Sequence, residues 1–250
     1  MHRYFIEVAY KGTRYSGFQL QPNANTVQAE VEKALAVLFR QPFKLTGSSR
    51  TDAGVHALQN FFHFDTEIKM QEKHCYNINA ILPEDITVNT IYEVGITSHC
   101  RFNALSREYK YFVYSKKNPF LTDTAYYYPY KTDLTILQAA AEIITQYYDF
   151  ASFAKRNTQV KTTVCSISYS EWSQQNECLQ YNVVANRFLR GMVRALVATM
   201  LKVGRGIISL EEFKLLIEGK SAITADFSAP PQGLHLVQVT YPSSMSIPVL

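Results

Sequence analysis

The strongest candidate for chemistry in this sequence is one acidic residue in a polar loop. Asp52 lies in the segment GSSRTDAGVHALQNFFHFDT, residues 47–66, two positions after Arg50. The apolar side chains that follow alternate like those of a strand, with three on one face: Leu58, Phe62 and Phe64. Such a strand would hold the carboxylate at the end of a rigid sheet, where it could act as a nucleophile or a base. The run Thr-Asp-Ala-Gly also fits an ordinary turn in which the aspartate binds its own backbone.

A tyrosine among cationic residues is the second candidate. Tyr109 lies in RFNALSREYKYFVY, close to Arg101, Arg107 and Lys110. Aromatic rings that stack on bases, next to cations that pair with phosphates, are typical of proteins that hold an extruded nucleotide. A strand tyrosine can equally be a packing residue with its hydroxyl at the sheet edge. The neighbouring cations favour the nucleotide-binding role.

Three arginines share one stripe of a helix predicted over residues 187–203: Arg187, Arg190 and Arg194. The first two fit a solvated basic face. Val197 and Leu201 continue the stripe beyond Arg194, because successive residues turn by about 100° around a helix. The helix around Arg194 should therefore be apolar on every side and buried. A buried arginine needs a carboxylate partner.

Composition excludes several other classes of protein. The 250 residues are 47% hydrophobic and 18% charged, with a net charge of only +4, which is normal for a soluble globular chain. No uncharged apolar run approaches the roughly 18 residues that a membrane span needs, so we expect a cytoplasmic protein. The four cysteines are widely spaced and form no CxxC pair, and no HExxH motif occurs: Cys75, Cys100, Cys165 and Cys178. We expect reduced cysteines in or near the core and no metal site.

The first half of the chain is predicted to alternate between strands and helices. Thr26 or Asn25 can cap a helix that carries an apolar stripe from Val27 to Leu38 and ends before Pro42. The other predicted elements are strands over 3–10, 43–46, 58–65 and 87–94, and a helix from about residue 70 to Pro83.

The second half repeats this order. A strand from Arg107 should put alternate residues on one face: Arg107, Tyr109, Tyr111 and Val113. The other predicted elements are a helix capped by Asp133, a hairpin with its turn at 173–177, the helix over 187–203, a helix opened by a Ser209–Glu212 capping box, and a final strand LHLVQVTY. This order predicts an α+β fold of two related modules, residues 1–100 and 101–250, each a mainly antiparallel sheet with helices on one face.

Several motifs closely resemble those of the tRNA pseudouridine synthase A family. They are RTDAGVHA, SREYKYFVY, NRFLRGMVRALV, YKGTRYSGFQ, NAILPEDI and APPQGLHLVQVTY. The chain departs from the usual family pattern at Lys11, at Ser48 with Ser49, and at Gly191. The resemblance implies isomerisation of uridine to pseudouridine in the anticodon stem of tRNA and at its junction with the loop, without a cofactor.

The resemblance also implies roles for individual residues. Asp52 would be the catalytic residue, Arg50 would hold the RNA backbone or fill the space that the base leaves, and Tyr109 would stack on the flipped uracil. Arg194 would pair with Asp52 in a cleft between the modules of a homodimer. The remaining candidate substrate-binding residues are Arg107, Lys110, Arg187 and Arg190. The sequence leaves open whether Asp52 attacks ribose C1′, attacks uracil C6, or acts as a base toward a glycal.

Two further basic patches fit a path for an RNA backbone, although each alone is better explained as a solvated face. They contain Lys155, Arg156 and Lys161 beside Phe150 and Phe153, and Lys116 with Lys117. Two alternative functions stay open at this point. The chain could be a non-catalytic tRNA-binding or tRNA-folding protein, or a hydrolase that loses a glycosyl-aspartate adduct to water.

Overall fold

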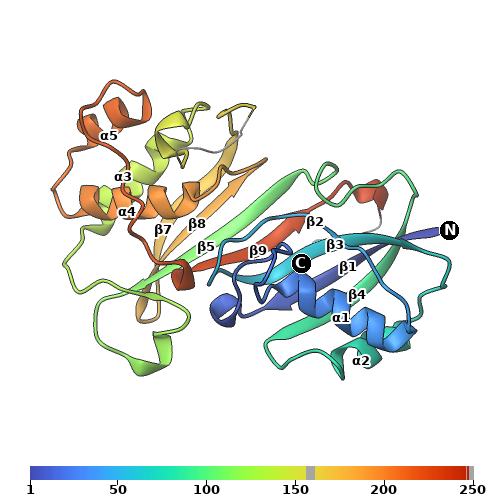
Figure 1. Ribbon diagram of the computed structural model, residues 1–250. Helices are drawn as coiled ribbons and strands as arrows, with labels where there is room; N and C mark the ends of the chain where they lie inside the picture. Colours follow the sequence, from blue (N-terminus) through green and yellow to red (C-terminus); the bar gives the residue numbers. More distant parts are fainter. Residues whose placement is uncertain (156–160, 246, 248–250) are drawn as a thin grey trace. The chain divides into compact units, whose positions relative to one another are not determined.

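The chain forms two compact units, and the last segment of the chain belongs to the first of them. The computed structural model (Figure 1) describes residues 1–155, 161–245 and 247. The first unit contains residues 1–105 together with 235–250, and the second contains 106–234. The modules expected from the sequence, 1–100 and 101–250, differ from these units because the final strand pairs with a strand of the first unit, His235 opposite His56.

The sheet of the first unit is built on β1 (His2–Tyr10), which lies between β3 (His56–Thr66) and β4 (Ile86–Val94). Both of these pairings are antiparallel. β2 (Thr46–Gly47) also pairs antiparallel with β3, whereas β9 (Leu234–Thr240) pairs parallel with it. The short strand expected over 43–46 is thus reduced to two residues at Thr46–Gly47.

Two helices cover one face of this sheet. α1 (Val27–Phe39) begins after Thr26, whose side chain accepts a hydrogen bond from the Ala29 N–H, and this confirms the predicted cap. α2 (Glu72–Asn79) packs against α1 through the edge-to-face rings of His74 and Phe39. A further ring contact joins Phe39 to Phe43, which packs on Phe64 of β3. The helices therefore lie over the face that carries Phe64.

The opposite face of the same sheet is also buried. Phe5 and Phe61 both pack against the ring of Tyr241, which follows β9. The residues of β3 from Gln59 to Phe64 are all buried, whereas Leu58 is 55% exposed. The alternation that places Leu58 on the same face as Phe62 and Phe64 is interrupted here, because the pairing of β3 with β1 shifts register between Val8 and Tyr10.

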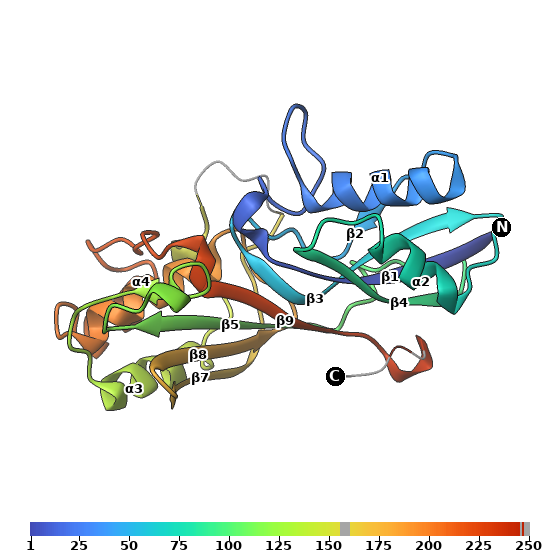
Figure 2. The same ribbon diagram turned by 90° about the horizontal axis from the view of Figure 1, so that it is seen from below.

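The second unit contains an antiparallel sheet in the order β5 (Ser106–Tyr114), β8 (Cys178–Ala185) and β7 (Ile167–Gln175), as Figure 2 shows. The short strand β6 (Tyr126–Tyr127) pairs parallel with β5. The alternation predicted for β5 is confirmed, because four residues are buried on one face: Arg107, Tyr109, Tyr111 and Val113. Strands β7 and β8 form the predicted hairpin.

Helices cover the sheet of the second unit. α3 (Leu134–Ile144) is capped by the Asp133 side chain, and α5 (Leu210–Ile217) opens with the predicted capping box. α4 (Met192–Gly204) contacts β7, where the indole of Trp172 donates to the sulfur of Met200 at 3.4 Å. Short 3-10 helices occupy Gly12–Arg14, Pro119–Leu121, Ala151–Phe153, Pro231–Gly233 and Ser243–Met245.

The start of α4 differs from the prediction. The helix begins at Met192 and not at Arg187, because Gly191 takes the left-handed conformation with φ of 73° and interrupts the helical path. Glycine adopts this conformation without strain, and asparagine is the side chain that tolerates it best. Arg187 and Arg190 therefore precede the helix and do not share a helical stripe with Arg194.

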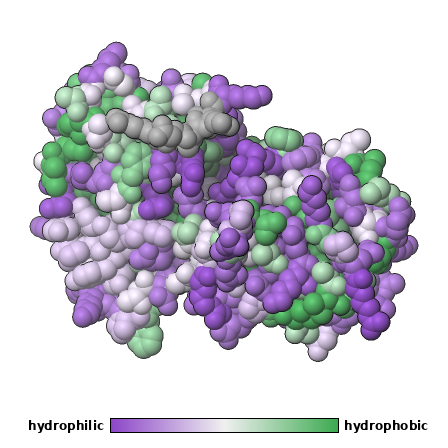
Figure 3. All heavy atoms as spheres, viewed as in Figure 1, coloured by the Kyte–Doolittle hydropathy of each residue, from purple (hydrophilic) through white to green (hydrophobic). Residues whose placement is uncertain are grey.

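None of the described helices is long and apolar enough to cross a membrane. On the face shown in Figure 3, hydrophilic residues cover most of the surface and hydrophobic residues lie between them in separate groups. The large apolar side chains are mainly inside the two units, with Tyr111, Tyr181, Phe5 and Phe61 fully buried.

Candidate active site

The loop that carries Asp52 is held by the segment that follows β1. The Phe18 N–H donates to the Thr51 carbonyl at 3.2 Å, and the Gly54 N–H donates to the Tyr15 carbonyl at 3.4 Å. At Gly12 the two segments approach so closely that a Cβ would lie 2.0 Å from the Val55 carbonyl oxygen. These contacts fix the backbone on both sides of Asp52, whose side chain is partly exposed.

Buried side chains fix the same loop from beneath. The Tyr10 hydroxyl lies 2.7 Å from the Thr51 hydroxyl, and the Asn60 amide donates to Tyr10 at 3.2 Å and to the Ser49 carbonyl at 3.0 Å. Asn60 is completely buried. The backbone on either side of Arg50 is thus tied to the sheet, while the Arg50 side chain is exposed.

Sequence patterns give little indication of this network. Tyr10 and Asn60 lie within predicted strands, and the partners Tyr10 and Thr51 are 41 residues apart. An asparagine buried in an otherwise apolar strand is the one feature that could have indicated it, because a buried amide requires hydrogen-bond partners.

We expect Tyr10→Phe to lower kcat about tenfold with KM nearly unchanged, because one hydrogen bond that orients the loop is lost. Steady-state kinetics with a tRNA transcript, the substrate that the motif resemblance implies, measures both constants. Tyr4→Phe is the matched control, since the Tyr4 hydroxyl is also on β1 but accepts from the Met70 N–H, at 3.1 Å. Equal loss of kcat in both variants would show that the effect reflects general stability.

Tyr109 lies on the buried face of β5. Its side chain is 8% exposed, and its ring meets the edge of Phe188 at 5.2 Å. Arg107, on the same face, donates to the Asn186 carbonyl at 2.9 Å. Arg107 therefore ties β5 to the segment after β8, and Lys110 points to the other side of the strand. The ring of Tyr109 is packed within the second unit and is not a freely exposed surface tyrosine.

Arg194 lies on α4, a helix that is almost entirely buried. Eleven of the thirteen helix residues are buried, and the two exceptions are Arg194 and Lys202. This confirms the expectation that the helix around Arg194 is apolar on every side. The Arg194 Nε donates to the Ala229 carbonyl at 2.6 Å, which fixes the direction of the side chain.

Arg194 lies close enough to Tyr111 for its charge to act on that side chain. Burial raises the pKa of Tyr111, and the nearby positive charge of Arg194 opposes that rise. Tyr111 shares the buried face of β5 with Tyr109 and donates its hydroxyl to the Pro230 carbonyl at 2.7 Å. The segment before β9 therefore meets Arg194 through Ala229 and Tyr111 through Pro230.

The chain is similar over nearly its whole length to proteins named for one activity. A family model described as tRNA pseudouridine synthase matches residues 6–103 and 147–242. The chain belongs to the tRNA pseudouridine synthase family. Among its relatives, a tRNA pseudouridine synthase A of Parabacteroides distasonis is 43% identical over 251 residues, which cover 98% of each chain. The corresponding protein of Bacteroides fragilis is 41% identical and covers 98% of each chain, and that of Staphylococcus aureus is 35% identical over 95% of this chain and 90% of its own.

Membership of the tRNA pseudouridine synthase family makes the chain an isomerase that acts on tRNA. The family match includes the loop of Asp52 and the helix of Arg194. Tyr109 lies between the two matched stretches, but within the full-length similarity to the relatives.

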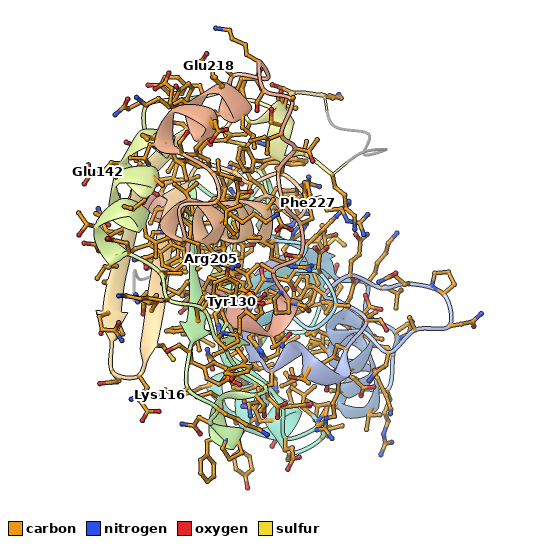
Figure 4. The ribbon with its side chains drawn as sticks, turned by 90° about the vertical axis from the view of Figure 1, so that its left-hand side faces the viewer. Lys116, Tyr130, Glu142, Arg205, Glu218 and Phe227 are labelled. Carbon is orange, nitrogen blue, oxygen red and sulfur yellow. The ribbon has the colours of Figure 1, made fainter. Side chains whose placement is uncertain are left out.

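The residues of the two additional basic patches differ in burial. Phe150 and Phe153 are completely buried, so the expectation that they present rings beside Lys155 and Lys161 is wrong. Their rings pack in the core of the second unit, where Phe153 contacts Phe213. Arg156 lies outside the described residues. Lys116 and Lys117 are exposed in the loop after β5, where Figure 4 labels Lys116.

Proposed function

We propose that this member of the tRNA pseudouridine synthase family converts uridine to pseudouridine in the anticodon stem of tRNA and at its junction with the loop, in the cytoplasm. The observation that carries the proposal is a carboxylate, Asp52, on a loop whose backbone is fixed on both sides, within the stretch that matches the family. A precisely held carboxylate is what an isomerisation without a redox step requires.

The reaction rearranges the nucleotide without adding atoms. The bond from ribose C1′ to uracil N1 breaks, the uracil turns, and C1′ forms a bond to C5. C5 loses its proton and N1 gains one, so that the product is an isomer of the substrate. Asp52 acts as the ionised carboxylate whether it attacks C1′, attacks C6, or removes a proton. The target base must leave its stack to reach Asp52.

We propose that Tyr109 supports the extruded uracil and that Arg194 keeps Asp52 ionised and oriented. The shared buried face of Tyr109 and Tyr111, and the proximity of Arg194 to Tyr111, support a common role for these side chains. Arg194 stands on an otherwise buried helix, where an arginine without a negative partner would be costly. Asp52 and Arg194 belong to different units, and their pairing is the central element of the proposal.

Tyr109→Ala should lower kcat/KM about a hundredfold, because stacking on a base contributes on the order of 1–3 kcal/mol. Tyr109→Phe keeps the ring and should retain most of the binding contribution. Kinetics on a tRNA transcript gives both values. If Tyr109→Ala turned over normally while remaining folded, the base would have to be held by another residue.

The proposed phosphate contacts are Arg50, Lys110 and Arg190, with Arg107 and Arg187 bordering the extruded nucleotide. Binding should weaken steeply with salt, since each phosphate contact adds about 0.7–0.9 to the slope of log affinity against log salt. Arg190→Ala should reduce this slope by about one. Lys33→Ala is the control, because Lys33 is an exposed cation on α1. A flat salt dependence for the unmodified protein would contradict the proposed contacts.

We also propose that the protein is a homodimer in which one tRNA contacts both subunits, on the basis of family membership alone. Light scattering at working concentration measures this directly, and a fully active monomer would exclude it.

The activity is tested by incubating the purified protein with an unmodified tRNA transcript and mapping pseudouridine. A tRNA-binding or tRNA-folding protein would change no nucleoside, and a hydrolase would release free uracil. Pseudouridine at uridines of the anticodon stem and its junction with the loop would support the proposal, and its formation only elsewhere in the tRNA would contradict the proposed substrate position.

A further inference from the structure

Three side chains with metal-binding atoms converge on the face of the first sheet that the helices do not cover. His63 lies on β3, and His99 and Cys100 lie in the segment that connects β4 to β5. One donor atom from each residue lies within 4.8 Å of the others. Because 36 residues separate His63 from His99, their spacing in the sequence gives no metal-binding motif. Folding alone brings them together.

The donor atoms of this cluster lie close to one another. The Nδ1 of His63 is 3.1 Å from the Sγ of Cys100. The ring centroids of His63 and His99 are 4.5 Å apart in an edge-to-face arrangement. In a zinc site, metal-to-donor distances of about 2.0–2.3 Å place neighbouring nitrogen and sulfur ligands roughly 3.5 Å apart. The cluster needs only small side-chain movements to reach that spacing.

A cation next to the cluster would oppose metal binding if its charge were not compensated. The positive charge of Arg3 acts on both imidazoles of the cluster. The Arg3 charge is compensated, because Arg3 makes two hydrogen bonds of 2.7 Å to the Asp65 carboxylate.

Burial also favours a specific site over incidental surface binding. Cys100 is completely buried and His63 is 7% exposed, whereas His99 is partly exposed and provides access from solvent. Two imidazoles and one thiolate form a donor set of intermediate softness, which suits Zn²⁺ better than Mg²⁺ or Ca²⁺.

We propose that His63, His99 and Cys100 form a binding site for one Zn²⁺ ion, with water as the fourth ligand. The Cys100 thiol, which donates to the Thr46 carbonyl at 3.1 Å, would release its proton to solvent on binding, and its sulfur would bond to the metal. The Cys100 carbonyl accepts a hydrogen bond of 2.5 Å from the Tyr241 hydroxyl, which lies 3.2 Å from the Ser48 hydroxyl. The site therefore contacts the start of the Asp52 loop through Tyr241, but it does not depend on the proposed reaction.

Cobalt substitution tests the site. Protein stripped of metal with a chelator is titrated anaerobically with Co²⁺. The affinity for Zn²⁺ is then measured by competition with a chromophoric chelator. We expect one equivalent to bind, with a thiolate-to-cobalt charge-transfer band that Zn²⁺ abolishes. Cys100→Ala should remove the band, and His99→Gln should weaken affinity about a hundredfold or more, since even outer contacts of metal sites contribute about 10–100-fold.

Cys75→Ala is the matched control, because Cys75 is a free thiol of the same unit outside the cluster. It should leave both the band and the affinity unchanged. Circular dichroism identifies any variant that fails to fold, and His99→Gln changes a partly exposed residue and serves where Cys100→Ala does not fold. The absence of a cobalt band in the unmodified protein, its persistence in folded Cys100→Ala, or its dependence on Cys75 would each overturn the proposal.

Discussion

Replacing Asp52 by asparagine should abolish pseudouridine formation and leave the fold and the affinity for tRNA nearly unchanged. The carboxylate is proposed to react, and its loss should raise the barrier by several kcal/mol, which corresponds to about a thousandfold or more in rate. The described backbone contacts of the loop, such as the hydrogen bond from Val55 to the Asp52 carbonyl, do not require the carboxylate. Single-turnover assays with saturating enzyme measure the chemical step.

Asp123→Asn is the matched control, because Asp123 is an exposed carboxylate in a loop of the second unit. It should retain full activity. Thermal unfolding and tRNA binding are measured for both variants. Activity of Asp52→Asn within about tenfold of the unmodified protein would exclude a reacting role for this carboxylate.

Replacing Arg194 by leucine should reduce activity at neutral pH by about a hundredfold. The guanidinium is proposed to pair with the Asp52 carboxylate, and removing one partner of an ion pair leaves the other charge uncompensated. The loss should appear in kcat/KM measured on a tRNA transcript.

Arg194→Lys should restore only part of the activity, because lysine keeps the charge but lacks the planar fork. Lys202→Leu removes the other incompletely buried cation of α4, which pairs with Asp226 at 2.8 Å, and should retain most of the activity. This comparison separates a specific role of Arg194 from general loss of stability. Activity of folded Arg194→Leu close to that of the unmodified protein would contradict the pairing.

Much of the fold could be predicted because its local signals are strong. The caps at Thr26, Asp133 and Ser209 were readable because a short polar side chain directly precedes a helical apolar pattern. The face of β5 followed from simple alternation, because only one of its two faces is buried deeply. The burial of the helix around Arg194 was likewise predictable from its periodicity.

The failures come from contacts that sequence patterns do not encode. A helical wheel over residues 187–203 treats Gly191 as part of the helix. In the structure, the left-handed backbone of Gly191 marks the point after which α4 begins. The alternation of β3 does not show that a second layer covers the other face of the sheet. The Tyr10 network and the cluster around Cys100 are built between residues far apart in the chain, so that neither has a local signature.

The contribution of both ends of the chain to the first unit has a consequence for synthesis on the ribosome. The strand β9, and Tyr241 behind it, complete a sheet whose first strand was made more than 220 residues earlier. The intervening unit is contiguous and can fold as it emerges, but the first cannot close until β9 has been synthesised. Its open sheet edge must stay soluble during that interval, and a nascent chain truncated before β9 lacks the aromatic ring that packs on Phe5 and Phe61. Closure of the unit that carries Asp52 is therefore coupled to the synthesis of β9.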